Sequence, residues 1–176
     1  MSFLQPTHEH AETSYEPFRI DADWPGRAEV RQKILSGNKL TASHKAEILE
    51  TETLNEIVRS FSECAPAKRF VPYIEMHEFE VLLFSDAHIL AEKTGIDISR
   101  IKSVLKAYPN PEEIDDDPAK APGKRLATLR NGYRKVAMGK AVSEAIGIHA
   151  IRKQCPHFNN WLTKFEHLVG CAHGKA

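Results

Sequence analysis

The stretch VPYIEMHEFEVLLFSD, residues 71–86, constrains the fold of this chain more than any other. Four consecutive apolar residues, 81–84, directly follow a segment that carries Glu75, Glu78 and Glu80. The apolar run has to be buried, and carboxylates beside it are costly to bury unless they are paired or bind a metal ion. The segment therefore predicts either a polar site at the edge of the core or a half-exposed face.

Length and charge set limits for the rest of the chain. A chain of 176 residues is long enough to bury a core and suits a single domain. Its 24 basic and 24 acidic side chains give a formal net charge of zero. A surface covered with positive charge for nucleic-acid binding is therefore not expected, although a local basic groove is compatible with these numbers.

The cysteines and the hydrophobic pattern indicate the compartment. Cys64, Cys155 and Cys171 lie far apart, and an odd number without a CxxC pair predicts neither a disulfide framework nor a zinc site. No apolar stretch approaches the roughly 20 residues of a membrane helix, and no signal peptide is recognisable. We expect a reduced, cytoplasmic protein with no membrane partner.

Most of the chain is predicted to be helical. Periodicity and capping residues predict helices over residues 27–35, from 42 to about 64, over 87–94, 98–105, 140–146 and 148–153, and from 156 onward. The last of these is the clearest, because its aromatic residues recur at helical spacing.

The best strand candidate is RFVPYIEM, residues 69–76, which is rich in aromatic and branched side chains. Pro72 restricts this strand to an edge or a bulge. Residues 77–84 are ambiguous between strand and helix, because short apolar runs fit both periods.

The acids after this strand are the first candidates for chemistry. In a strand, Glu78 and Glu80 share one face while His77 and Phe79 share the other, and in a helix His77 and Glu80 are neighbours. Either geometry can aim two carboxylates at Mg²⁺, which needs few protein ligands when substrate phosphates complete its shell. The alternative is a helix start, where the two acids interact with the helix dipole.

Three further motifs carry groups able to bind ions or to react. EEIDDDP (112–118) lacks the frame of a calcium loop and is predicted to be a solvated acidic loop. Gly123-Lys124 is not part of a GxxxxGK[ST] pattern, so Lys124 is either a phosphate contact at a helix start or a solvent-facing residue. Cys155 and His157, separated by one proline, are poorly placed to meet as nucleophile and base, so a thiol hydrolase is the least favoured hypothesis.

Three blocks, taken together and in this order, resemble the domain of unknown function family 4276. They are RFVPYIEMHEFEVLLFSD, NPEEIDDDPAKAPGKRL and GYRKVAMGKAVSEAIGIHAIRKQCPHFNNWLTKFEHL. Upstream, EPFRIDADWPG is similar to that family's Asp-Tyr-Tyr-x-Leu-Pro-x-Asp-Phe-Pro-Gly element, with Glu16 at the position of its first Asp. The resemblance covers about residues 15–168. It implies an α/β, TOPRIM-like fold, helix-rich with a small central sheet, in which acids bind Mg²⁺ for phosphodiester chemistry.

The resemblance also implies a site and a partner. Carried over to this sequence, the metal ligands are Glu16, Glu78 and Glu80, with His77 orienting one acid and Lys124 contacting a phosphate. Family members accompany ATPases in bacterial anti-phage defence or mobile-element loci, so an ATPase encoded nearby is the expected partner. DNA is a candidate substrate, and an oligomer is compatible with the sequence.

This chain departs from the family at its start. It lacks the strand ending in Glu-Gly-x-Thr-Glu whose first Glu is an expected metal ligand. We therefore expect an N-terminally truncated domain, with an irregular start over residues 1–14, a single TOPRIM-like domain over 15–169 and a frayed tail over 170–176. Two functions remain open: a Mg²⁺-dependent nuclease-type subunit, and a catalytically inactive partner-binding module or remnant.

Overall fold

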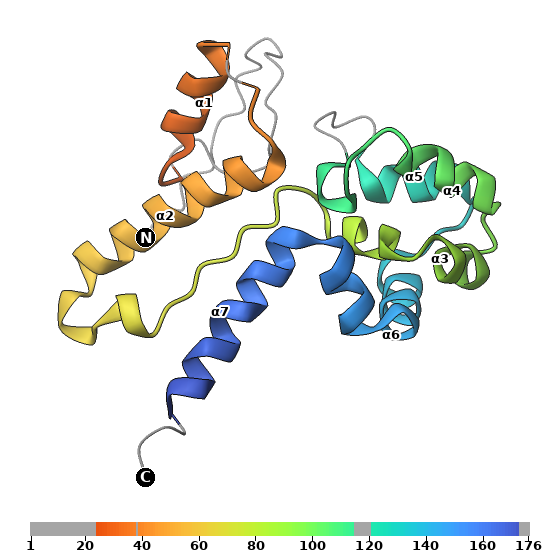
Figure 1. The fold of residues 1–176 in the computed structure, drawn as a ribbon. Helices are drawn as coiled ribbons and strands as arrows, with labels where there is room; N and C mark the ends of the chain where they lie inside the picture. The colour runs from red at the N-terminus through yellow and green to blue at the C-terminus, as the bar shows by residue number, and fades with distance from the viewer. Residues whose placement is uncertain (1–23, 38, 115–120, 173–176) are drawn as a thin grey trace, which may run out of the picture.

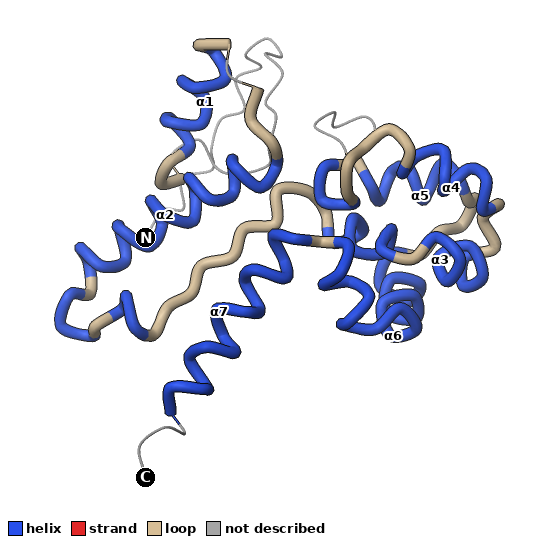
Figure 2. The backbone as a smooth tube through the Cα atoms, viewed as in Figure 1, coloured by secondary structure: helices blue, strands red, loops and turns tan. Residues whose placement is uncertain are grey.

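The computed structural model describes residues 24–37, 39–114 and 121–172 of the chain. These residues form α-helices and short 3-10 helices (Figures 1 and 2). In chain order the elements are α1 Arg27–Leu35, α2 Ala42–Ser60, η1 Ser62–Cys64, η2 Pro66–Lys68, η3 Phe79–Ser85, α3 Ala87–Thr94, α4 Ile98–Leu105, η4 Pro111–Glu113, α5 Pro122–Leu129, α6 Lys135–Gln154 and α7 Pro156–Ala172. The expected irregular start, 1–14, and the last four residues of the expected tail, 173–176, lie outside the described residues.

The predicted α/β, TOPRIM-like fold with a small central sheet is wrong. Residues 24–37, 39–114 and 121–172 contain no β-strand, and Figure 2 shows helix and loop throughout. The predicted strand 69–76 is instead an extended segment that follows η2 and runs between α2 and α7 (Figure 1). The helix-rich part of the prediction is retained.

Side chains, rather than a neighbouring strand, bond the backbone of this extended segment. Ile74 N–H donates to Glu50 Oε1 of α2 at 2.9 Å, and Trp161 Nε1–H of α7 donates to Val71 O at 3.4 Å. Pro72 has no N–H to offer a sheet. Backbone groups of the segment are therefore bonded by side chains of the two flanking helices. Residue propensity predicts extended backbone here, but it does not predict whether a strand or a side chain will bond to it.

Local capping signals place the helix boundaries well. The side chain of Thr41 accepts His44 N at the start of α2, and Asp86 accepts two backbone N–H groups at the start of α3. Gly95 ends α3 in the left-handed conformation with φ of 69°, and Gly147 breaks α6 with φ of 74°. The helix expected over 87–94 is thus confirmed, and Gly147 breaks α6 between the helices expected over 140–146 and 148–153.

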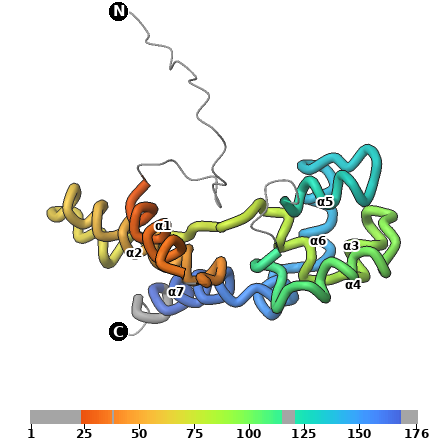
Figure 3. Tube along the Cα trace, turned by 90° about the horizontal axis from the view of Figure 1, so that it is seen from above, coloured from red at the N-terminus to blue at the C-terminus, as the bar shows by residue number. Residues whose placement is uncertain are grey.

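The buried residues form two clusters. The smaller joins α1 and α2 and includes Val30, Leu49 and Met76, while the larger joins η3 and α3 to α6. Figure 3 shows α1 and α2 at one end and α3 to α6 at the other, with the segment after η2 and α7 running between them. No helix among the described residues combines the length and the apolar character that a membrane crossing requires.

The apolar run 81–84 lies in the larger cluster. It forms most of η3, packs mainly against α6, and buries all four of its side chains. Seven residues is long for a 3-10 helix. Such helices are usually short, because their hydrogen-bond geometry is poorer than that of an α-helix. Burial of the apolar run offsets that disadvantage, and Glu78 and Glu80 are consequently held at the start of η3.

Candidate functional site

Glu78 and Glu80 converge on a single cation. Lys135, the first residue of α6, places its Nζ 3.0 Å from Glu78 Oε1 and 3.4 Å from Glu80 Oε1. Burial lowers the pKa of Lys135, but its contacts with the two carboxylates outweigh this effect and raise the pKa above the ordinary value. The Glu80 side chain is 6% exposed and that of Lys135 is 52% exposed, so solvent reaches this site from the lysine side.

The second oxygen of Glu78 binds the start of α5. Gly123 N–H donates to Glu78 Oε2 at 2.8 Å, and the residue before α5, Ala121, provides no side-chain cap. The carboxylate thus satisfies one of the open N–H groups of the helix from another part of the chain. A Cβ on Gly123 would lie 2.5 Å from Glu78 Oε2 and 2.6 Å from Lys135 Nζ, so glycine at this position allows the carboxylate and the ammonium to approach.

Tyr133 completes the surroundings of the acid pair. Burial raises its pKa to about 12, and the nearby Glu80 and Glu78 add to the increase. Its buried hydroxyl has no hydrogen-bond partner among the described residues. The phenol therefore stays protonated at neutral pH and cannot serve as a general base there.

The structure brings together only part of the predicted site. Glu78 and Glu80 meet, but His77 lines a separate cavity beside Glu75, and Lys124 is exposed on α5 next to Gly123. The predicted ligand Glu16 lies outside the described residues. Within the described ranges, no group of three or more His, Cys, Asp or Glu side chains is placed to hold a metal ion. Two carboxylates suffice for Mg²⁺ only with phosphates or waters, and only if the Lys135 ammonium moves away.

A second polar site lies at the start of α7. Glu112, in η4, is 2% exposed and accepts His157 N at 2.9 Å and Phe158 N at 2.8 Å. Its neighbour Glu113 accepts Ala42 N of α2 at 2.9 Å. The predicted solvated loop EEIDDDP is therefore wrong at its first two residues, because both carboxylates cap helices that begin elsewhere in the chain. The remaining acids of that loop, 115–117, lie outside the described residues.

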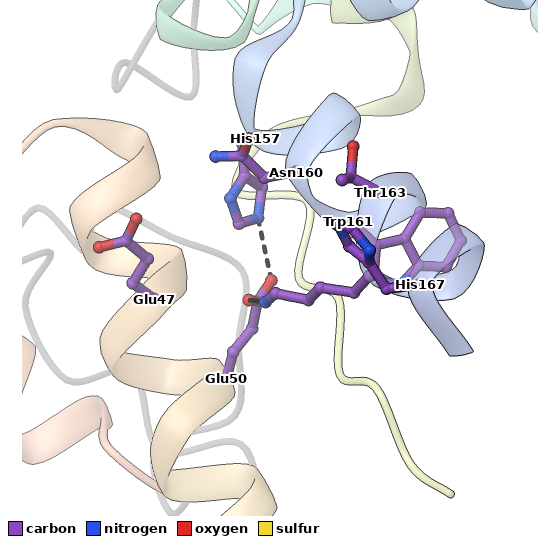
Figure 4. A pocket seen from close by; sticks show the side chains of 8 residues that line it. Glu47, Glu50, His157, Asn160, Trp161, Thr163 and His167 are labelled. Atoms are coloured by element: carbon purple, nitrogen blue, oxygen red, sulfur yellow. Dashed lines mark ion pairs between the residues drawn. The ribbon is translucent and has the colours of Figure 1, made fainter. Parts of the chain in front are cut away.

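His157 of α7 and Glu50 of α2 point toward one another across a pocket of about 430 Å³ (Figure 4). His157 Nε2 lies 2.9 Å from Glu50 Oε1, and Lys164 Nζ lies 4.0 Å from Glu50 Oε2. Burial lowers the pKa of His157, but Glu50, Glu112 and Glu75 together outweigh burial and raise it above the ordinary value. The imidazole and the carboxylate thus form an ion pair that ties α7 to α2 when His157 is protonated.

The structure gives no support to a nucleophilic Cys155. Its side chain is fully buried, and its Sγ lies 3.3 Å from Ser85 Oγ. Burial raises the pKa of the thiol to about 12, so the reactive thiolate is scarce at neutral pH. His157, the proposed base, is paired with Glu50 instead.

Comparison with protein families identifies the chain. The profile of the family described as "Domain of unknown function (DUF4276)" matches residues 15–166. This match spans most of the chain. The chain belongs to the DUF4276 family. It matches no curated protein and no solved structure.

The matched part of this DUF4276 protein contains every contact described above, from Thr41 to Lys164. Sequence reasoning found Glu78 and Glu80 but missed Lys135, Glu50 and Glu112. Glu78 and Lys135 are 57 positions apart in the sequence, so no local pattern predicts their contact. The caps that Glu78 and Glu112 provide did leave a signal in the sequence. Pro122 and Pro156 each mark a helix start, and neither start is preceded by a residue with a capping side chain.

Proposed function

We propose that this DUF4276 protein is a non-catalytic binding subunit in which Glu78 and Glu80, two acids of the predicted metal site, hold the fold together. One observation carries the proposal: both oxygens of Glu78 are committed inside the chain, one to Lys135 Nζ and the other to Gly123 N–H. The partner that the family resemblance suggests is an ATPase encoded nearby, in a bacterial defence or mobile-element system.

Two other acids support the same interpretation. Glu112 and Glu113 also spend their oxygens on helix N-termini, so three carboxylates of one chain cap three helices. Caps of this kind typically stabilise a helix by about 1 kcal/mol, and hydrogen bonds to charged groups contribute up to roughly 3 kcal/mol when buried. A carboxylate that releases such a bond to take a metal ion loses this contribution.

A second candidate function is a Mg²⁺-dependent nuclease-type subunit acting on DNA, and a specific observation favours it. Glu78 and Glu80 already converge on one positive charge, and that charge is on a half-exposed side chain. An incoming Mg²⁺ with bound phosphate could exchange with the Lys135 ammonium, which would then pair with the phosphate. Lys124, exposed on the adjacent helix, would be a second phosphate contact.

Metal titration separates the two candidates. The wild-type chain and the double variant Glu78→Gln, Glu80→Gln are titrated with MgCl₂ and MnCl₂ by calorimetry, and their melting temperatures are compared. The binding-subunit proposal expects no saturable metal heat in the wild type and a lower melting temperature for the variant. Saturable metal binding that the variant abolishes would contradict it and favour the nuclease.

Partner binding is tested with the ATPase itself. The two proteins are co-expressed, and the complex is assayed on plasmid DNA with Mg²⁺ or Mn²⁺. The proposal expects co-elution and no nicking that depends on Glu78 and Glu80. Failure to co-elute would exclude the ATPase as the partner, and nicking that disappears in the double variant would establish the nuclease.

A further inference from the structure

An open cavity of about 640 Å³ lies between the extended segment, η3, α6 and α7, on the side of the segment that carries His77. The odd-numbered side chains 73, 75, 77 and 79 face it, while Glu78 and Glu80 turn toward Lys135. Tyr73 and Glu75 lie in the extended segment, where alternate side chains share a face, whereas Phe79 and Leu82 face the cavity from η3, in which residues three apart share a side. The volume is in the range of sites that hold a small molecule.

Aromatic rings form much of the cavity wall. Tyr73 and Trp161 have ring centroids 4.7 Å apart, and Phe158 lies 5.9 Å from Trp161. Phe79 and Ile148 are half exposed at the cavity, so an apolar surface is open to solvent. Burying such a surface under an apolar ligand is favourable at roughly 25 cal/mol per Å².

The charged side chains of the cavity are acidic. Glu75 and Glu144 line it, and among the described residues no lysine or arginine does. Glu75 is held among the rings by Tyr73, whose hydroxyl donates to Glu75 Oε2 at 2.6 Å. Electron-rich ring faces attract cations, and a carboxylate beside them adds a direct counter-charge.

We propose that this cavity binds an organic cation with a flat apolar body, that is, an ammonium or guanidinium group carried on an aromatic or alkyl skeleton. The cation lies against Glu75, beside the ring cluster of Tyr73, Phe158 and Trp161, and the apolar body covers Phe79 and Ile148. The proposal does not depend on the proposed function, because it uses neither Glu78 nor Glu80.

Burial makes the negative charge of Glu75 costly. Burial raises its pKa to about 7, the Tyr73 hydrogen bond lowers it, Glu112 raises it and His157 lowers it. His77 donates its backbone N–H to the same carboxyl. The other titratable groups nearby are Glu144 and the imidazoles of His77 and His157. A bound cation favours the ionised form of Glu75. We therefore expect the cation to bind more tightly at pH 8 than at pH 6.

The test uses a matched pair of probes. 1-Naphthylmethylamine and its neutral analogue 1-naphthalenemethanol are titrated into the full chain carrying Trp24→Phe, which leaves Trp161 as the single tryptophan. We expect the amine to quench Trp161 and to bind at least about tenfold more tightly than the alcohol at pH 8. Equal affinity for the two probes, or quenching by neither, would overturn the proposal, and this comparison requires no change in the cavity.

Variants then locate the preference. Glu75→Gln keeps the shape of the side chain and should reduce the amine-to-alcohol ratio to within about twofold, whereas Glu92→Gln, an exposed acid on α3, should leave it unchanged. A ratio that survives Glu75→Gln contradicts the assignment of Glu75. A short peptide with arginine between two leucines is titrated in parallel: tighter binding of the peptide than of the amine identifies a polypeptide as the source of the cation, and the reverse identifies a free small molecule.

Discussion

The two carboxylate regions of this molecule begin three residues apart and solve the same problem differently. At Glu78 and Glu80 an ammonium group supplies the compensating charge, and the pKa of that group, Lys135, rises. At Glu75 and Glu112 the carboxyl groups are compensated mainly by a phenol and by backbone N–H groups, and it is the acids whose pKa rises, to about 7 for Glu75.

A neutral donor and a cation differ in how far they stabilise a buried carboxylate. A neutral donor satisfies a lone pair but leaves most of the cost of desolvating the negative charge, whereas an ammonium at about 3 Å offsets that cost directly. The first region is therefore an ion-pair anchor, and the second is a group of acids that remain responsive to protons and to cations.

The largest expected effect is in the second region, at Glu112. Replacing Glu112 with Ala leaves the N–H groups of His157 and Phe158 without their acceptor in a buried site, and we expect a loss of about 3 kcal/mol in the free energy of unfolding. Urea denaturation measures it. The adjacent Glu113→Ala is the matched control, since α2 keeps its Thr41 cap, and about 1 kcal/mol is expected there. Equal losses for the two variants would mean that burial of the cap makes no difference.

The next largest effect is expected in the first region, on removal of the Lys135 ammonium. Lys135→Met removes the ammonium but keeps the apolar stem, so Glu78 and Glu80 both lose their ion pair while the Gly123 N–H bond to Glu78 remains. We expect a loss of about 2 kcal/mol at pH 8, less than for a fully buried pair because Lys135 is half exposed. Urea denaturation measures the loss, and it should shrink in a background with Glu78→Gln and Glu80→Gln, where no carboxylate remains to pair. An equal loss in both backgrounds would show that Lys135 acts through packing alone.

Sequence reasoning succeeded where the determining interactions are local. Asp86, Gly95 and Gly147 act within a few residues of themselves, and the helix boundaries they predict are those of the structure. The ambiguity of residues 77–84 between strand and helix was not resolved by local pattern, and the structure places 79–85 in the 3-10 helix η3.

The errors share one cause, which is partner choice at long range. Residues 69–76 have strand propensity, but whether an extended segment pairs with a strand or with Glu50 and Trp161 depends on helices far away in the chain. The same applies to Glu112, which was predicted to be solvated because an acidic run usually is. Nothing within the run indicates that a helix beginning 44 residues later, at Pro156, places its N–H groups there.

A smaller effect is expected from pH in the wild-type chain. The pKa of Glu75, about 7 when folded, exceeds its ordinary value of 4.5, so the folded chain binds more protons than the unfolded chain and stability falls as pH rises between these values. His157 acts in the same direction, because its raised pKa stabilises the fold below 6.5 and the gain is lost as pH rises through the folded value. Glu75 alone should cost about 1 kcal/mol between pH 6 and pH 8. Urea denaturation at both pH values measures it, and Glu75→Gln should remove that part of the slope; an unchanged slope would assign the pH dependence to other groups.

The smallest net effect tests how tightly the first region is closed. Gly123→Ala gains up to about 1 kcal/mol in helix propensity, but its Cβ displaces the ends of Glu78 and Lys135, which lie 2.5 and 2.6 Å from its position. In the wild type we expect these effects to leave a net loss below about 1 kcal/mol. In a background with Glu78→Ala and Lys135→Ala, both obstructing groups are absent, so the same substitution should become stabilising. The difference between the two backgrounds, measured by urea denaturation, is the coupling of Gly123 to the ion pair. If the substitution has the same effect in both backgrounds, the carboxylate and the ammonium are not held over α5, and the contrast between the two regions loses its structural basis.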